Sequence, residues 1–295
     1  MRPVPDAIKT ALHAQICISP QMQRVLYTLA AALAISLAFP AIATADPIAV
    51  HHTQGAVHGF LVVRSQTGKT LGYGEFTQLA DGDRVTAHLV YHFRDGSLDD
   101  ETTIFTQHDN FQLISDHHIQ RGRFFPKPSD ILVEASGQIT TRTPGKDGKD
   151  GKENVETQHI DLPPDVSNGM IGTLLANVEP GAAPFKLGQV VPTGGKGRLI
   201  HLAITPGAQA SFSVAGASRK ATVYRMKLDL GGIEGIVAPI VGKQPPDIIV
   251  WILEGDVPLF VREIGQLSED GPIVSIEFAG ATFPHNSAPP KKKAP

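Results

Sequence analysis

Two histidine-containing stretches carry residue types that bind metal ions. "HLVYHF" places His88 and His92 four residues apart, so on a β-strand both side chains point to the same face. "SDHH" at 115–118 places Asp116 and His118 on one face of its strand. Imidazoles and a carboxylate suit zinc or another divalent metal, so these four residues form a candidate metal site if the two strands approach. The alternative is a set of solvent-facing side chains, because no H-E-x-x-H or H-x-H context accompanies them.

A second group of polar and aromatic residues surrounds a pair of prolines. "GKQPPDIIVW" at 242–251 contains Lys243, Asp247 and the only tryptophan, Trp251. The prolines stiffen the loop that presents Lys243 and Asp247. An ammonium and a carboxylate beside an indole could bind a polar head group next to an apolar cavity. The simpler alternative is a turn leading into a core strand, with Trp251 buried.

The acidic run "DGSLDDE" at 95–101 offers oxygen ligands for calcium. Its spacing does not match the twelve-residue calcium loop, so we interpret it as a solvated hairpin tip, since loops that join strands are usually polar and exposed. No G-x-S-x-G motif is present, and the only cysteine, Cys17, lies near the N-terminus, upstream of the apolar run 25–39. We therefore predict no catalytic residue and no cofactor, which favours a protein that is not an enzyme.

The N-terminal region has the pattern of a signal peptide. "MQRVLYTLAAALAISLAFPAIATA" at 22–45 begins with a basic Arg24, continues with an apolar run and ends in Ala-Thr-Ala. The apolar run, 25–39, is too short to span a bilayer comfortably. We expect cleavage after Ala45, with Met22 as a possible true start, and export to the periplasm or beyond the cell. A membrane anchor or a buried helix is the alternative.

The composition is that of a globular protein with many turns. The chain has 295 residues, of which 41% are hydrophobic and 19% charged, with 29 glycines and 23 prolines. The formal net charge of −3 and the lack of a basic stripe argue against nucleic acid as a partner.

Alternation of apolar and polar residues predicts β-strands through most of the chain. Asp-Gly pairs at 81–82 and 95–96 predict tight hairpins, and the spacing of turn signals favours an antiparallel meander. The predicted strands are 57–63, 70–79, 84–93, 102–107, 111–120, 131–135, 139–142, 198–205, 210–214, 222–230, 248–254, 259–266 and 273–278.

Three other segments depart from the strand pattern. We predict one helix within 161–178, capped by Asp165 or Ser167. The charged, Gly-rich stretch 143–156 is predicted to be an exposed, mobile loop, and the Pro- and Lys-rich tail 283–295 to be disordered. The apolar face of the helix would consist of Met170, Leu174, Leu175 and Val178.

Together these elements predict a mainly β fold. We expect residues 46–282 to form a single domain, built as a large curved antiparallel sheet or a half-open β-barrel with about one helix on its concave side.

The block "TLGYGEFTQLADGDRVTAHLVYHFRDGSLDDETTIF" at 70–105, with its turn chemistry, resembles uncharacterised secreted bacterial proteins. Their architecture is similar to that of the periplasmic lipoprotein-carrier-like families, in which a curved antiparallel sheet holds a helix on its concave side. The resemblance covers about 46–280 and implies a cavity for an acyl chain or a similar ligand. It carries over no functional residue.

We therefore expect an exported, non-enzymatic protein that binds a lipid or another hydrophobic or amphipathic small molecule in the concavity of its sheet. The alternatives are a metal-dependent hydrolase that uses the His/Asp set, and a structural envelope module without a ligand. A membrane surface stays open as a partner, and the sequence does not fix the oligomeric state. The predicted ligand-binding residues are Tyr91, Phe93, Leu113, Lys243, Asp247 and Trp251.

Overall fold

The chain divides into two units, Met1–Thr44 and Ala45–Pro295, and every residue described below belongs to the second. A computed structural model describes residues 47–144, 153–179, 181–214, 216–229 and 245–282. Within these ranges no helix is long and apolar enough to cross a membrane. The predicted signal peptide and the predicted disordered tail lie outside the described residues.

One large antiparallel sheet dominates the described residues. Its strands follow the order β15-β10-β11-β12-β13-β14-β1-β2-β3-β4-β5-β6-β7-β8, and β9 pairs with β10, so the ladder does not close on itself. The one helix that the structure describes is α2 (Ile171–Ala176). The strands are β1 (Val57–Ser65), β2 (Thr70–Asp81), β3 (Arg84–Phe93), β4 (Leu98–Gln107), β5 (Phe111–Arg121), β6 (Ser129–Glu134), β7 (Gln138–Pro144), β8 (Glu153–His159), β9 (Phe185–Thr193), β10 (Lys196–Val214), β11 (Ala217–Asp229), β12 (Ile248–Leu253), β13 (Phe260–Gln266), β14 (Ile273–Phe278) and β15 (Ala281–Thr282).

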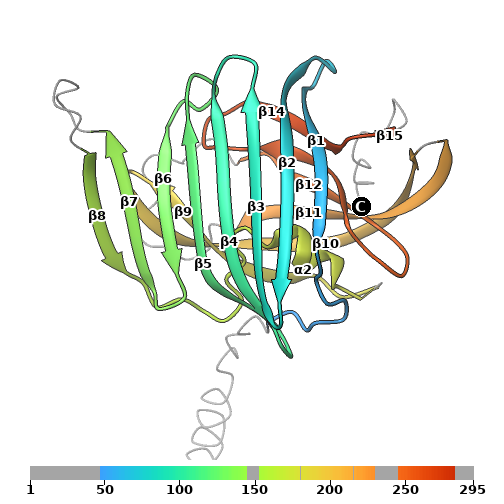
Figure 1. Cartoon of the computed structure of the whole chain (residues 1–295), viewed down its shortest axis with the longest axis horizontal. Coiled ribbons are helices and arrows are strands. Elements are labelled where there is room, and N and C mark those ends of the chain that lie inside the picture. The colour runs from blue at the N-terminus through green and yellow to red at the C-terminus, as the bar shows by residue number, and fades with distance from the viewer. Residues whose placement is uncertain (1–46, 145–152, 180, 215, 230–244, 283–295) are drawn as a thin grey trace, which may run out of the picture. The chain divides into compact units, whose positions relative to one another are not determined.

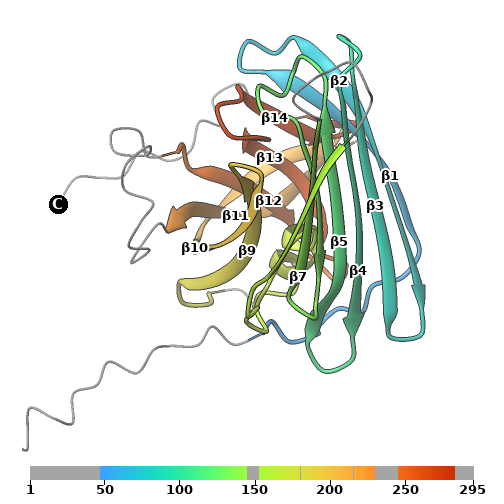
Figure 2. The ribbon, with the colours of Figure 1, turned by 90° about the vertical axis from the view of Figure 1, so that its left-hand side faces the viewer.

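The sheet bends so that its two halves face each other. Strands β1–β8 form one broad layer, and β9–β13 cross behind it (Figure 1). In the turned view α2 lies between the two layers, on the concave side of the sheet (Figure 2). The predicted fold, a large curved antiparallel sheet with one helix on its concave side, is confirmed.

The main core fills the space between the layers. Along β3, Val85 and Ala87 point inward and are buried, while the alternating residues point outward, as the two-residue period of a strand requires. Inward residues of β3–β7 pack against α2 and against β9–β12 in one hydrophobic cluster. Phe105 of β4 and Leu175 of α2 lie in this cluster and are fully buried.

Two smaller clusters complete the packing. The first joins Leu61 and Val63 of β1 to Tyr91, Phe93 and Val274, at the bend where β14, β1 and β3 meet. The second lies on the other face of β10–β13, where every alternate residue of β12 is also apolar. Its buried members are Phe212, Ala221, Val223, Ile249, Trp251 and Val261.

Side chains bridge the two ends of the open ladder. Thr141 Oγ1 donates a hydrogen bond to the Gly195 carbonyl, and Gln158 Nε2 donates one to the Gly197 carbonyl. Lys196 Nζ lies 3.0 Å from Glu156 Oε1. These contacts hold β7 and β8 against the β9–β10 turn, so the bend of the sheet is maintained without a closing backbone ladder.

The structure corrects several element boundaries. The segment 143–156, predicted to be a loop, contributes Thr143–Pro144 to β7 and its end, from Glu153, to β8; residues 145–152 lie outside the described residues. Two predicted strands, 198–205 and 210–214, are one strand, β10, with a register shift between Pro206 and Gln209. Strands β8, β9 and β15 were not predicted.

The predicted helix caps are wrong. The helix is only six residues long, and its N-cap is Met170, which makes no side-chain capping bond. Asp165 Oδ2 instead accepts a hydrogen bond from the Gly188 amide, and Ser167 Oγ donates one to the Gly188 carbonyl. These polar side chains therefore satisfy backbone groups of β9, whose neighbour on that side is a loop and not a strand.

Replacing Phe105 by alanine tests the assignment of the core. Phe105 is 0% exposed, so Phe105→Ala leaves a cavity and should lower the free energy of unfolding by about 3–5 kcal/mol. Phe60→Ala is the matched control, because Phe60 is 56% exposed on β1 and its loss should change stability by about 0.5 kcal/mol or less. Urea denaturation measures both values, and equal effects would contradict the assigned faces.

Candidate functional site: a carboxylate and histidine cluster on the concave face

Neighbouring strands place a set of polar side chains side by side on the concave face. The register pairs Leu89 with Glu101 and Glu101 with His118. Because directly paired residues project to the same face, each row of the ladder stays on the concave side. The flanking rows consist of Tyr91, Asp99 and Gln120 on one side and of Ala87, Thr103 and Asp116 on the other.

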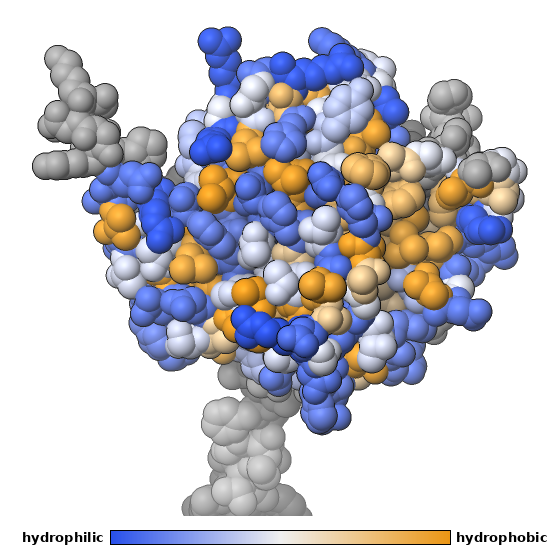
Figure 3. Space-filling model, viewed as in Figure 1, coloured by the Kyte–Doolittle hydropathy of each residue, from blue (hydrophilic) through white to orange (hydrophobic). Residues whose placement is uncertain are grey.

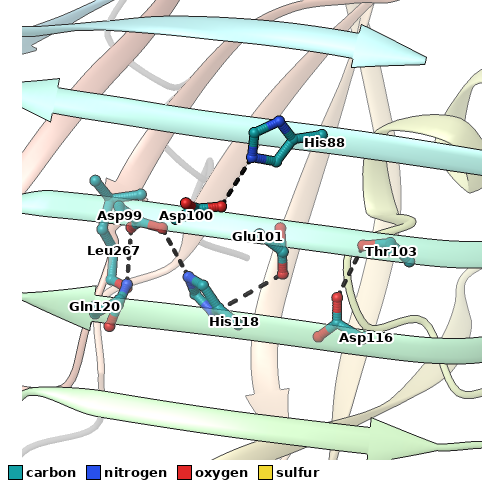
Figure 4. Close-up of polar contacts among 9 residues, drawn as sticks. All are labelled: His88, Asp99, Asp100, Glu101, Thr103, Asp116, His118, Gln120 and Leu267. Atoms are coloured by element: carbon teal, nitrogen blue, oxygen red, sulfur yellow. Dashed lines mark hydrogen bonds and ion pairs between the residues drawn. The ribbon is translucent and has the colours of Figure 1, made fainter.

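His118 stands at the centre of this cluster. Its Nε2 lies 2.7 Å from Asp99 Oδ1, and its Nδ1 lies 3.9 Å from Glu101 Oε1 (Figure 4). Burial opposes the charge of the imidazole, but Glu101, Asp99 and Asp116 outweigh that effect and raise the pKa of His118 to about 10. His118 is therefore an imidazolium at neutral pH.

Asp99 and Gln120 seal one side of the cluster. Both are buried. Gln120 Nε2 donates hydrogen bonds to Asp99 Oδ2 at 2.9 Å and to the Leu267 carbonyl at 2.7 Å (Figure 4). Gln120 thus ties β5 to the segment that follows β13, and both oxygens of Asp99 accept hydrogen bonds.

Glu101 and Glu263 carry strongly perturbed carboxyl groups. Burial, together with the charges of Asp116, Asp99 and Glu263, raises the pKa of Glu101 to about 8, although His118 lowers it. Glu263 comes from β13, and burial and Asp99 raise its pKa to about 7. Both side chains therefore hold a proton over part of the neutral range, because the cluster has more carboxylates than its single imidazolium can balance.

Asp116 lies beneath the loop that precedes α2. It is 0% exposed, its Oδ1 accepts a hydrogen bond of 2.8 Å from Thr103 Oγ1, and its Oδ2 has no hydrogen-bond partner within the described part of the chain. Burial raises its pKa, although the charges of His118 and His117 and the polar side chains of Thr103 and Asn168 lower it. Gly169 covers the pair at φ +63, and a Cβ there would lie 1.8 Å from Thr103 Oγ1, so only glycine fits this position.

Tyr91 borders the cluster on the side of the core at the bend. Burial, followed by Glu263, Asp99 and Glu101, raises the pKa of its phenol, which therefore stays neutral. Its ring lies over Gly74, where an added Cβ would approach the ring to 2.5 Å.

The cluster is enclosed but still accessible to water. A fifth of the Glu101 side chain and a quarter of the His118 side chain remain exposed, although burial shifts the pKa of both groups. Apolar side chains surround them: Phe76 pairs with Leu89 in the register, and Phe76 and Phe260 pack against both the main core and the core at the bend. The concave face therefore presents a polar centre with an apolar border.

The structure separates the four residues predicted to bind a metal ion. Asp116 and His118 share the concave face, but His88 and His92 point outward from β3. His88 Nε2 lies 2.9 Å from Asp100 Oδ1 on that outer face (Figure 4), and His92 is exposed. Within the described ranges no group of three or more His, Cys, Asp or Glu side chains could hold a metal ion.

Three outward-facing histidines lie in one row of the register, and each is explained by a contact with a carboxylate on a neighbouring strand. The register places His58, His88 and His117 in one row across β1–β5, separated by Thr77 and Thr102. The face that contains this row mixes hydrophilic with scattered hydrophobic side chains (Figure 3). Each of these histidines contacts a carboxylate of a neighbouring strand: Glu75, Asp100 and Asp130 respectively.

The six residues predicted to bind a ligand do not come together. Tyr91 and Phe93 are buried in the core at the bend, and Leu113 is buried in the main core. Trp251 is buried on the opposite face of β12, with the Arg262 guanidinium 5.1 Å from its ring. Asp247 Oδ2 accepts a hydrogen bond of 2.6 Å from Arg225, and Lys243 lies outside the described residues.

Interpreting 95–101 as a solvated hairpin tip was wrong for its second half. Strand β4 begins at Leu98, so Asp99 and Glu101 lie on the same inward face as Thr103. The sequence did contain a signal for this face, because Asp99 and Glu101 continue the two-residue alternation of the inward-facing Thr103 and Phe105. Gln120 follows Asp116 and His118 in the alternation of β5 and pairs directly with Asp99. Glu263 gave no signal in the sequence, because it comes from β13 and reaches the cluster only through the bend of the sheet.

Comparisons with known proteins give a likeness of structure only. No known family profile and no curated protein matches the chain. Among solved structures, the chain is similar to a β-barrel-like protein of a domain of unknown function, DUF1849, from Brucella abortus. The TM-score is 0.42 at 9% sequence identity, and the match covers 79% of this chain and 100% of that chain.

The cluster predicts a specific dependence of stability on pH. Glu101 has a folded-state pKa of about 8, above its usual 4.5, so the folded protein binds more protons than the unfolded chain between these values. Its contribution to stability therefore falls as pH rises from 5 to 8. The Glu101→Gln variant keeps this side chain neutral at every pH. The free energy of unfolding of the variant, minus that of the unmodified protein, should therefore rise by about 1.4 kcal/mol per pH unit within that window.

Urea denaturation at pH 5, 6, 7 and 8 measures this difference. Asp100→Asn is the control: Asp100 is the next residue of β4 but faces outward beside His88, and its profile should run parallel to that of the unmodified protein. A Glu101→Gln profile that also runs parallel would contradict the assignment.

Proposed function

We propose that the protein binds an amphipathic small molecule, such as a lipid, on the concave side of its sheet. The observation that carries this proposal is the partial exposure of Glu101 and His118, two desolvated polar groups that neither pack fully into the core nor face bulk water. Ligand sites in proteins are mostly apolar with a few precisely placed polar groups, and this face has that composition.

Phe76, Leu89 and Phe260 would contact the apolar part of the ligand. Leu89 lies directly opposite Glu101 in the register, and Phe76 lies directly opposite Leu89. All three keep part of their surface uncovered, unlike the fully buried side chains of the main core. Covering this remaining surface would contribute about 25 cal/mol for each Å² removed from water.

The polar end of the ligand would meet Glu101, His118 and Glu263. Protonated Glu101 donates a hydrogen bond, and its ionised form accepts one, so the pair of glutamates can adapt to a ligand group at neutral pH. Asp99 holds the His118 ring in place through a 2.7 Å contact. The site thus has an oriented imidazolium and titrating carboxyls beside an apolar wall.

We infer from residues 22–45 that the chain is exported. A basic residue, an apolar run and a small-x-small site before Asp46 support this proposal. Expression with the native N-terminus in a bacterium should give a periplasmic product whose N-terminal sequence starts at Asp46. A product that stays in the cytoplasm with its N-terminus intact would contradict export.

Paired substitutions on β3 test the binding proposal. The neutral amphiphile monododecanoyl glycerol should bind the mature chain in native mass spectrometry and in titration calorimetry. Leu89→Gln places an amide on the apolar wall and should weaken binding about tenfold, equivalent to about 1.4 kcal/mol. Val90→Gln is the matched control, because Val90 is the next residue and faces outward. No uptake by the unmodified protein, or equal losses in both variants, would contradict the proposal.

A further inference from the structure

We infer that the concave site selects ligands that carry an organic cation, an ammonium or a guanidinium group, beside their apolar part. This inference rests on the proposed function and assigns the charge of the ligand. It is carried by the arrangement of carboxylates around a single imidazole and by one buried carboxylate oxygen that lacks a partner.

The charges on the concave face do not balance. Asp99 and Glu101 come from β4, Asp116 from β5 and Glu263 from β13, and these four carboxyl groups act on one another through space. His118 is the basic group that lies against them. If all four were ionised, the imidazolium would leave an excess of three negative charges in a desolvated site, a cost that a cationic ligand group would reduce.

Asp116 provides the independent observation. Its side chain is fully buried on the concave face, and Oδ2 is without a hydrogen-bond partner among the described residues. Oδ1 already accepts from Thr103, and the second oxygen points away from that bond (Figure 4). The Asn168 amide lies close enough to lower the pKa of Asp116, but its hydrogen bonds go to the backbone of Val190. A buried acceptor with no better donor is costly, and a charged N–H group placed among these carboxylates would compensate it best.

The apolar border favours an organic cation over a metal ion. Leu89 lies opposite Glu101, Phe76 lies opposite Leu89, and Phe260 packs against the same cores as Phe76. Such a surface gains from covering carbon atoms, which a hydrated ion lacks. An amine at the end of an alkyl chain satisfies both parts of the site.

Binding of a cation would displace protons from the cluster. The groups that face the ligand position are Tyr91 of β3, Asp99 and Glu101 of β4, Asp116 and His118 of β5, and Glu263 of β13. Burial and mutual repulsion hold protons on Glu101 and Glu263 in the empty site, whereas a bound ammonium favours their ionised forms. Affinity for an amine should therefore rise between pH 6 and 8, with release of protons.

Three amphiphiles with the same chain separate this inference from the proposed function. Dodecylamine, dodecanol and dodecanoate are titrated into the mature chain below their micelle concentrations, in two buffers that differ in ionisation enthalpy. We expect dodecylamine to bind at least about tenfold more tightly than the other two, with protons released. Equal affinities or a preference for dodecanoate would overturn the cation inference and leave the binding proposal standing. Absence of binding by all three would overturn both.

Variants and ions complete the test. Glu101→Gln and Glu263→Gln should each weaken dodecylamine about tenfold more than they weaken dodecanol, because the glutamine amide can still hydrogen-bond a hydroxyl but cannot carry the negative charge that an ammonium needs. Asp100→Asn on the outer face should alter neither. Using two variants guards against one that fails to fold, which circular dichroism detects. If calcium or magnesium chloride displaced dodecylamine at a concentration equal to or lower than that of the amine, the site would be a metal site and the inference would be overturned. An equal loss of dodecanol and dodecylamine binding in the glutamine variants would also overturn the inference.

Discussion

The desolvation of carboxyl groups on the concave face is the constraint on which the site depends. A sheet that bends over its own apolar face removes most of the water from the side chains on that face, including Asp99, Glu101 and Asp116. Each charge must then find a partner or take up a proton. Asp99 finds His118 and Gln120, whereas Glu101 and Glu263 respond with raised pKa values.

The two faces of the same strands show how much burial matters. His118 and Asp99 meet at 2.7 Å on the concave face, and His88 and Asp100 meet at 2.9 Å on the outer face. The geometry is almost the same, but the inner carboxylate is 6% exposed and the outer one 34%. Water screens the outer pair and makes it worth little, while the inner pair fixes an imidazolium where a ligand would bind.

Most of the fold could be predicted from the sequence because strands leave a local signal. Alternation and Asp-Gly turns located β1–β3 and β5 closely, and the strand count implied a large curved sheet. Strand β9 was missed although it forms a local hairpin with β10 across Gly194 and Gly195. The predicted caps failed because the contacts between the 165–168 loop and β9 are not a local property: Asp165 and Ser167 bond to Gly188 and not to the helix.

The site was harder to predict than the fold. Asp116 and His118 were recognised as sharing a face, but their partners were sought among His88 and His92, which the two-residue period places on the other side of the sheet. Asp99 and Glu101 were assigned to a hairpin tip because loops that join strands are usually polar and exposed. The bend of the sheet between β13 and β4 brings Glu263 close to Glu101. The spacing of residues along the chain cannot predict this proximity.

The titration of Glu101 tests the account most directly. Carbon-13 NMR of the glutamate carboxyl groups between pH 4 and 10, assigned with Glu101→Gln, measures its midpoint in the folded protein. The account predicts a midpoint near 8, as given by burial among Asp116, Asp99 and Glu263. A midpoint near the usual 4.5 would mean that water reaches the cluster freely. It would contradict the desolvation of the concave face on which the proposed binding site depends.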